Sequence, residues 1–129
     1  MTLVDTSIWI AVFQQRAPLD LAAVVDVDDI VTCLPVVQEV LQGFRDERAF
    51  RAAREAMTAM RCVESPLASD VVEGALDLYR TARRNGITVR SSVDCLIAAC
   101  AIRNDLEVLH RDRDFTELAK VSRLRQRRA

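Results

Sequence analysis

Short β-branched runs alternate along this chain with longer stretches of helical periodicity, and this alternation most constrains the fold. The short runs at 2–4, 29–33, 62–65 and 107–110 have the length and composition of strands. Helices are expected from Thr6 and over 19–26, 36–44, 47–60, 69–85, 91–103 and 115–121. Strands that alternate with helices form βαβ units, so the pattern predicts an α/β fold with a parallel sheet of short strands.

The length of 129 residues suits one domain, which we expect over residues 1–120 with a basic C-terminal tail over 121–129. The longest apolar run, 95–102, is too short to span a bilayer. The first ten residues carry Asp5 and lack the basic start of a signal peptide. We therefore expect a cytoplasmic protein with no membrane association.

Charge and cysteine usage exclude several classes of site. The net charge of −1 argues against a domain that binds nucleic acid through a wholly basic surface. The four cysteines show no CxxC pair and there is only one histidine, so a zinc site is not expected. The cysteines lie in apolar segments and are predicted to be buried, reduced thiols. With only three glycines and no glycine-rich loop, a P-loop or dinucleotide fold is not expected either.

Two carboxylates stand at positions where a ligand site and a helix cap are both reasonable interpretations. Asp5 lies between the first strand and the first helix, where it can cap the helix or face a ligand beyond the carboxyl end of the sheet. Asp94 lies in the first turn of a helix that is apolar on nearly every face, and Ser91 precedes it with the spacing of a capping box. A buried carboxylate needs a partner, a proton or a metal. Both interpretations stay open for each residue.

Three further acids are candidates on weaker grounds. Glu39 lies at the edge of the apolar face of helix 36–44, where an exposed glutamate is the commoner meaning. Asp112 and Asp114 follow the fourth expected strand, and a turn or a helix cap explains one of them. Acids placed after strands and in first helical turns can converge on one edge of a parallel sheet. Several like charges there need a cation, and Mg²⁺ or Mn²⁺ suits an all-oxygen site.

Four blocks in order give the chain a resemblance to PIN-domain ribonucleases, specifically to VapC-type toxins of VapBC toxin–antitoxin modules. The blocks cover about residues 1–120 and read VDTSIWI (4–10), LPVVQEVLQGF (34–44), SSVDCLIAACAIRND (91–105) and EVLHRDRDF (107–115). The resemblance implies a metal-dependent endoribonuclease with an α/β/α sandwich around the parallel sheet. His110 departs from the family pattern, because relatives often carry Thr or Ser before the acidic turn.

The resemblance also implies roles for individual residues and partners. Asp5, Glu39, Asp94 and Asp112 would be the catalytic, metal-binding acids, with Asp114 as an alternative fourth ligand. Thr6 or Ser7 would supply a hydroxyl beside the first acid and the substrate. Apart from the resemblance, Arg111 and Arg113 alternate with the last acids and are candidates to contact RNA phosphates, although solvated faces balanced by nearby acids explain them equally well. The substrate would be structured RNA of the tRNA or rRNA class. The protein partners would be a VapB-type antitoxin and a second copy of the chain, in a homodimer, a heterotetramer or a larger complex with the antitoxin.

Two alternative functions remain compatible with the same residues. The first is a PIN-like nuclease that processes RNA or cuts structured DNA without a toxin role. The second is a catalytically silent α/β module that binds a partner, since every acid has a capping explanation. A phosphoacceptor receiver domain is disfavoured because Asp5 stands alone after the first strand and Lys120 lies far past the last expected one.

Overall fold

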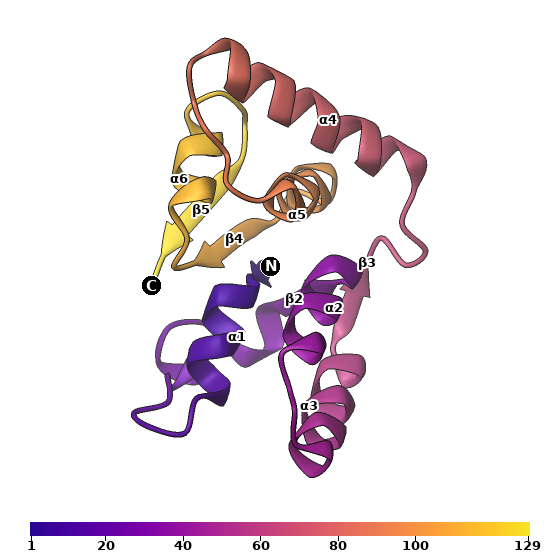
Figure 1. The fold of residues 1–129 in the computed structure, drawn as a ribbon, viewed down its shortest axis with the longest axis vertical. Coiled ribbons are helices and arrows are strands. Elements are labelled where there is room, and N and C mark those ends of the chain that lie inside the picture. The colour runs from indigo at the N-terminus through magenta and orange to yellow at the C-terminus, as the bar shows by residue number, and fades with distance from the viewer.

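Five parallel strands form one sheet in the order β3-β2-β1-β4-β5 in the computed structural model, which describes all residues from 1 to 129 (Figure 1). The strands are β1 Thr2–Val4, β2 Ile30–Cys33, β3 Arg61–Val63, β4 Glu107–His110 and β5 Arg125–Arg128. The first strand therefore lies at the centre of the sheet, between β2 and β4.

Six helices cover the two faces of this sheet. They are α1 Thr6–Phe13, α2 Leu34–Gln42, α3 Glu47–Ala59, α4 Ser69–Arg84, α5 Ser92–Arg103 and α6 Arg113–Ala119. Parallel strands are joined by right-handed crossovers, so the direction in which the chain moves across the sheet decides which face a helix covers. The chain moves outward from β1 to β3 with α1, α2 and α3 on one face, then returns to β4 and β5 with α4, α5 and α6 on the other (Figure 1). The expected α/β/α sandwich with a short-stranded parallel sheet is confirmed.

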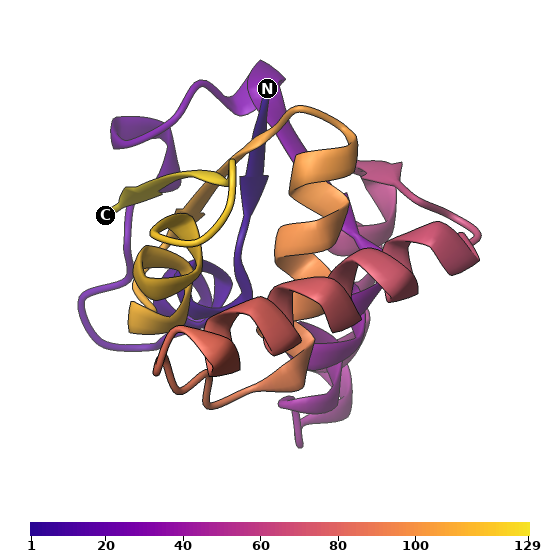
Figure 2. The ribbon, with the colours of Figure 1, turned by 90° about the horizontal axis from the view of Figure 1, so that it is seen from above.

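The core lies between the sheet and α5. Leu3, Val31 and Val108 on the three central strands are fully buried. Seven of the twelve residues of α5 are buried as well. This helix is covered by the sheet on one side and by α4, which crosses its outer side, on the other (Figure 2). A helix in such a position has few faces in contact with water, which explains why residues 95–102 are almost wholly apolar.

Two of the expected elements are wrong. The helix predicted over 19–26 is replaced by a single 3₁₀ turn, Leu21–Ala23. A second 3₁₀ turn, Val27–Asp29, follows it, and the carboxylate of Asp26 caps this turn by accepting from the backbone N–H of Asp28. The prediction that 107–110 is the last strand is also wrong, since Arg125–Arg128 pairs with it as β5. Four polar residues form this strand, so its sequence carries no strand-like hydrophobic alternation.

The buried face of α4 differs from the predicted one by one residue. Val72, Leu76 and Tyr79 have the helical spacing that predicts a core-facing stripe, but 43%, 52% and 41% of their surface is exposed. Val71, Leu78 and Ala82 are buried in their place. Gly86 follows the helix with a φ of +72°, in agreement with the glycine stop that the sequence predicts. An exposed apolar stripe consequently runs along the outer side of α4.

The predicted state of the cysteines agrees with the structure. Cys33, Cys95 and Cys100 are buried, Cys62 is half-buried and none of the four forms a disulfide. Burial raises the pKa of the Cys95 thiol to about 11, which keeps it protonated and unreactive at neutral pH. None of the helices has the length and apolar character needed to cross a membrane.

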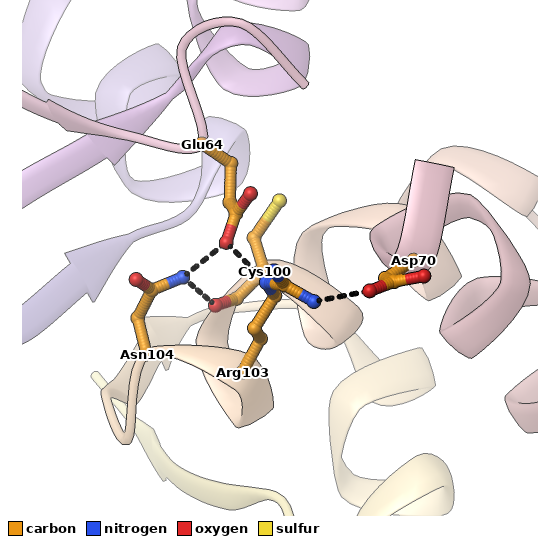
Figure 3. Close-up of polar contacts among 5 residues, drawn as sticks. All are labelled: Glu64, Asp70, Cys100, Arg103 and Asn104. Carbon is orange, nitrogen blue, oxygen red and sulfur yellow. Dashed lines mark hydrogen bonds and ion pairs between the residues drawn. The ribbon is translucent and has the colours of Figure 1, made fainter. Parts of the chain in front are cut away.

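Arg103 connects the end of α5 to the segment that joins β3 to α4 (Figure 3). Its Nε lies 2.9 Å from Glu64 Oε1 and its Nη1 lies 3.3 Å from Asp70 Oδ2. Asn104 donates to the same Glu64 oxygen over 3.1 Å and to the carbonyl of Cys100 over 2.8 Å. The Glu64 side chain is only 10% exposed, so these two partners take the place of water around its carboxylate.

We expect Arg103→Met to lower the free energy of unfolding by about 1–2 kcal/mol, because it leaves the Glu64 carboxylate with Asn104 as its only partner. Arg51→Met is the matched control, since the Arg51–Glu47 pair on α3 is 76% and 72% exposed and should change stability by less than about 0.5 kcal/mol. Urea unfolding of both variants measures the difference. Equal stability of the two variants would contradict the expectation.

Candidate metal centre

The candidate acids gather where the order of the strands reverses. The chain leaves β1 toward β2 on one side, and β4 pairs with β1 on the other, so the carboxyl ends of β1 and β4 flank a topological switch point. Ligands of open α/β sheets bind outside such a point. Asp5 directly follows β1, and Asp112 lies two residues after the end of β4. The backbone N–H of Asp5 donates to the carbonyl of Leu109 over 2.9 Å, which keeps the two chain segments together.

Asp94, Asp112 and Asp114 form a compact carboxylate cluster at this edge. One oxygen from each of the three lies within 4.8 Å of the others. Asp94 is in the first turn of α5, Asp112 is the N-cap of α6 and Asp114 is in the first turn of α6. The two helices therefore bring their positive N-terminal ends to the same place, which favours negative charge there.

Asp114 holds the segment that begins α5. Its Oδ2 accepts from the backbone N–H groups of Arg90 and Ser91 over 3.0 and 3.1 Å. The capping box suggested by the spacing of Ser91 and Asp94 does not form, because Ser91 gives its N–H to Asp114 and its side chain makes no capping hydrogen bond. The carboxylate of Asp94 is consequently not used as a cap.

Asp5 both caps a helix and keeps one oxygen for a ligand, which are the two roles that its position in the sequence allows. Its Oδ2 caps α1, accepting from the backbone N–H of Ser7 over 3.0 Å and from the Ser7 hydroxyl over 2.6 Å. The same hydroxyl accepts from the backbone N–H of Arg111 over 3.0 Å, so Ser7 connects the loops after β1 and β4. The other oxygen of Asp5, Oδ1, is buried and has no hydrogen-bond partner.

Glu39 stands apart from the cluster of three aspartates. It is half-buried on α2, and the hydroxyl of Thr6 donates to its Oε1 over 2.8 Å. Thr6 is adjacent to Asp5 in the chain, so this hydrogen bond brings the Glu39 carboxylate to the Asp5 side of the edge. The structure thus brings Asp94, Asp112 and Asp114 together, with Asp5 beside them and Glu39 reached through Thr6.

Burial and the nearby negative charges make ionisation of Asp94 and Asp5 unfavourable. The pKa of Asp94 is raised to about 9, first by burial, then by a hydrogen bond with Asp114 and by the charges of Asp112, Asp5 and Asp114. Burial also raises the pKa of Asp5, although its hydrogen bonds with Ser7 act in the opposite direction. Such shifts arise where like charges are held together without a compensating cation.

The chemistry of these residues fits a divalent cation. Three of the four buried side-chain oxygens or nitrogens without a partner belong to the acids, namely Asp5 Oδ1, Asp94 Oδ2 and Asp114 Oδ1. Buried oxygens are rarely left unpaired, and each one calls for an unseen ligand such as an ion or water. Carboxylate oxygens are the ligands that Mg²⁺ and Mn²⁺ prefer. A cation among them would supply the missing partner and neutralise the repulsion.

Other predicted contact residues lie around this edge. Arg111 and Arg113 are exposed on the turn that carries Asp112, and neither forms an ion pair.

Two residues behind the turn, which the sequence does not reveal as part of the site, are His110 and Gln126. Their side chains contact each other over 2.6 Å. The position of His110 before the acids departs from the family pattern, but the sequence alone assigns it no role. Gln126 could not be found because the strand that carries it was not predicted.

Comparisons of the sequence and of the fold with known proteins give matches to one protein family. The PIN domain family model matches residues 2–121. The chain is 37% identical over 131 residues to a VapC ribonuclease of Mycobacterium bovis and to ribonuclease VapC11 of Mycobacterium tuberculosis, with 96% of each chain covered. Among solved structures it is similar to VapBC-5 of M. tuberculosis, with a TM-score of 0.75, 24% identity and 99% and 98% of the two chains covered. It also matches the sarcin-ricin loop cleaving toxin VapC20 of that organism, with a TM-score of 0.71, 21% identity and 97% and 99% covered.

Proposed function

This chain belongs to the PIN domain family, and on that basis we propose that it is a metal-dependent VapC ribonuclease, the toxin of a VapBC toxin–antitoxin module. The observation that carries the proposal is the group of acids at the β1–β4 switch point with three buried oxygens that lack a partner. The relatives that are 37% identical are themselves named VapC ribonucleases. We assign the nuclease acids to residues 1–120, and the basic C-terminal segment 121–129 completes the sheet beside them as β5.

We assign metal binding to Asp5, Asp94, Asp112 and Glu39, with Asp114 as an alternative ligand that also holds the start of α5. A bound Mg²⁺ or Mn²⁺ would lower the pKa of a water molecule and neutralise charge on the phosphodiester that the water attacks. Ser7 fixes the orientation of Asp5 against the Asp112 turn, and Thr6 fixes that of Glu39. The acids are thus oriented before substrate arrives.

Structured RNA is the proposed substrate. VapC20, which has the same fold, is described as cleaving the sarcin-ricin loop. The unpaired guanidinium groups of Arg111 and Arg113 flank Asp112 and are free to contact phosphates on either side of the scissile bond. Aromatic residues make up only 5% of the chain, which argues against recognition of an extended single strand by base stacking.

The proposed protein partner is a VapB-type antitoxin that inhibits cleavage. Several similar folds were solved in toxin–antitoxin complexes, including VapBC2 of Rickettsia felis bound to a promoter DNA fragment, which matches with a TM-score of 0.73 and 13% identity. A toxin of this kind acts where RNA and its antitoxin are present, so we place it in the cytoplasm.

The test is cleavage of tRNAs and rRNA stem-loops by the purified chain with Mn²⁺ or Mg²⁺, with and without EDTA. Cleavage that requires the metal would support the nuclease assignment, whereas cleavage that persists in EDTA would contradict it. Induced expression in cells tests the toxin role, because a toxin arrests growth and a cognate antitoxin relieves the arrest. Metal-dependent cleavage without growth arrest would favour an RNA-processing role.

We further propose that two copies pair through the exposed side of α4. Val72, Leu76 and Tyr79 form an exposed apolar stripe along this helix. If two α4 helices cross antiparallel about a two-fold axis at Leu76, the two Leu76 side chains meet and the apolar stripe of each helix lies along that of its partner. The stripe can therefore pair with its own copy, as an isologous dimer interface requires. Antitoxin binding to such a dimer would give a heterotetramer or a larger assembly.

We expect Leu76→Glu to weaken this dimer roughly hundredfold, because it places two like charges together at the two-fold axis. Light scattering after size exclusion should show a dimer for the wild type and a monomer for the variant. Val27→Glu is the control, since Val27 is 60% exposed but lies away from α4. A monomeric wild type at the highest attainable concentration, or an unaffected Leu76→Glu dimer, would refute this interface.

A further inference from the structure

A pair of hydrogen bonds connects β5 to the turn that carries Asp112. His110 is the last residue of β4, is fully buried and packs against Phe115 with ring centroids 5.2 Å apart. Its Nε2 lies 2.6 Å from Gln126 Oε1 on β5. Its Nδ1 lies 3.1 Å from the backbone nitrogen of Asp112. The imidazole ring is therefore a bridge between the edge strand and an acid of the candidate metal centre.

The geometry determines which nitrogen of His110 carries the proton. A backbone N–H can only donate, so Nδ1, which faces the N–H of Asp112, must be the unprotonated acceptor. Nε2 then carries the hydrogen and donates it to Oε1 of the Gln126 side-chain amide. Gln126 thus stabilises the tautomer that can hold Asp112, and loss of this acceptor would release the ring to adopt the other tautomer.

Two hydrogen bonds to Asp112 itself help to fix the position of its carboxylate. The backbone N–H of Asp112 is held by His110, and its Oδ1 accepts from the N–H of Asp114 over 2.9 Å. Its other oxygen, Oδ2, makes no hydrogen bond and is the atom available to a cation. With one oxygen and the backbone both held, the free oxygen has little freedom to move away from Asp94 and Asp114.

Gln126 is not needed to attach β5 to the sheet. The strand pairs with β4 over four residues, and Arg125 and Arg127 make ion pairs with Asp105 and Glu107 at 3.2 and 3.1 Å. Those contacts use alternate residues of β5, on the opposite face of the sheet from Gln126. The partly buried contact between Gln126 and His110 therefore has a role other than attachment of the strand.

We propose that Gln126 is a positioning residue for the metal centre, acting through the Nε2–H tautomer of His110 to hold Asp112. This inference rests on the proposed role of Asp112 as a metal ligand. It makes β5, which the sequence presents as a basic tail, part of the support of the active site. Groups that orient a metal ligand in this way typically change metal affinity by about 10–100-fold when they are removed.

The first measurement is the tautomer of His110, which can be read without ambiguity because it is the only histidine of the chain. We expect the ¹⁵N spectrum of histidine-labelled wild type to show an unprotonated Nδ1 and a protonated Nε2. Gln126→Met, which keeps the length of the side chain but removes the acceptor, should give a mixture of tautomers. Arg125→Met is the matched control, because it weakens an anchor of the same strand without touching His110.

The second measurement is Mn²⁺ affinity by calorimetric titration of the same proteins. We expect Gln126→Met to bind Mn²⁺ about tenfold more weakly than wild type and Arg125→Met to bind it normally. In RNA cleavage at subsaturating Mn²⁺, Gln126→Met should lower kcat and leave KM for RNA unchanged.

The outcomes separate this inference from the proposed function. Wild-type Mn²⁺ affinity in Gln126→Met, an equal loss in Arg125→Met, or an Nδ1–H tautomer in the wild type would each overturn the positioning role while leaving the nuclease assignment intact. If the chain cleaves no RNA but Mn²⁺ binding still depends on Gln126, the positioning role stands and the nuclease assignment fails.

Discussion

Asp94→Asn is expected to lower metal-dependent RNA cleavage by at least about a hundredfold, since a cation that neutralises the transition state contributes several kcal/mol and each 1.4 kcal/mol is worth about a factor of ten. Asp94 is the acid for which the structure offers no other task. Its carboxylate caps no helix, its Oδ2 is buried without a partner and it lies within the cluster formed with Asp112 and Asp114. Initial rates of cleavage of a fixed RNA at several Mn²⁺ concentrations measure the loss.

Glu55→Ala is the matched control for this experiment. Glu55 is an exposed acid on α3 whose side chain makes no ion pair, so its removal should leave the cleavage rate unchanged. If Asp94→Asn retains the wild-type rate while EDTA still abolishes cleavage, the metal is held by other residues and the assignment of Asp94 is wrong.

The same Asp94→Asn change is expected to make the metal-free protein more stable, by about 1–3 kcal/mol at neutral pH or several degrees in Tm. The folded state raises the pKa of Asp94 from its usual 3.8 to about 9. The folded chain therefore holds a proton that the unfolded chain has lost, and stability falls as the pH rises from 3.8 toward 9. Asparagine has the same shape and no proton to lose, so its advantage should widen between pH 5 and pH 8.

Added Mn²⁺ should reverse this order of stability. The ion binds the folded wild type and raises its Tm in proportion to the logarithm of ion concentration, whereas Asp94→Asn should respond weakly. Thermal unfolding of both proteins in EDTA and in Mn²⁺, at pH 5 and at pH 8, gives the Tm values that this comparison needs. A variant less stable than wild type in EDTA at both pH values would show that the carboxylate makes favourable contacts within the protein. Loss of cleavage together with gain of stability would also exclude unfolding as the cause of inactivity.

That the acids lie at one edge of the sheet could be predicted because it follows from strand direction alone. Asp5 and Asp112 each follow a strand, and parallel strands end at the same edge, so the sequence places both acids at that edge and the pairing of β1 with β4 makes them neighbours. The roles of Ser7 and Asp114 could not be predicted in the same way. They depend on hydrogen bonds to Arg111 and to residues 90–91, which are far away in the chain and are positioned only by the finished fold.

The errors in the predicted fold have equally specific causes. On α4, two stripes one residue apart both have helical spacing, and only the position of α5 decides that Val71 and Leu78 are buried in preference to Val72 and Leu76. On β5, the backbone pairs with β4 although no side chain of the strand is apolar. Periodicity reports burial of side chains, so it cannot detect a strand that is held mainly by its backbone and by ion pairs.

The central position of β1 has a consequence for how the protein folds. Thr2 pairs with Ile30 on one side and with Glu107 on the other, so contacts of very different sequence separation meet on one strand. Sheets dominated by distant pairings fold slowly, because a long loop must close before the pairing stabilises it. The β1–β4 pairing is also the place where Asp5 meets the turn of Asp112. A partly folded chain that has formed only its first three strands therefore possesses no assembled acid cluster, and acquisition of metal affinity during refolding should report this late step.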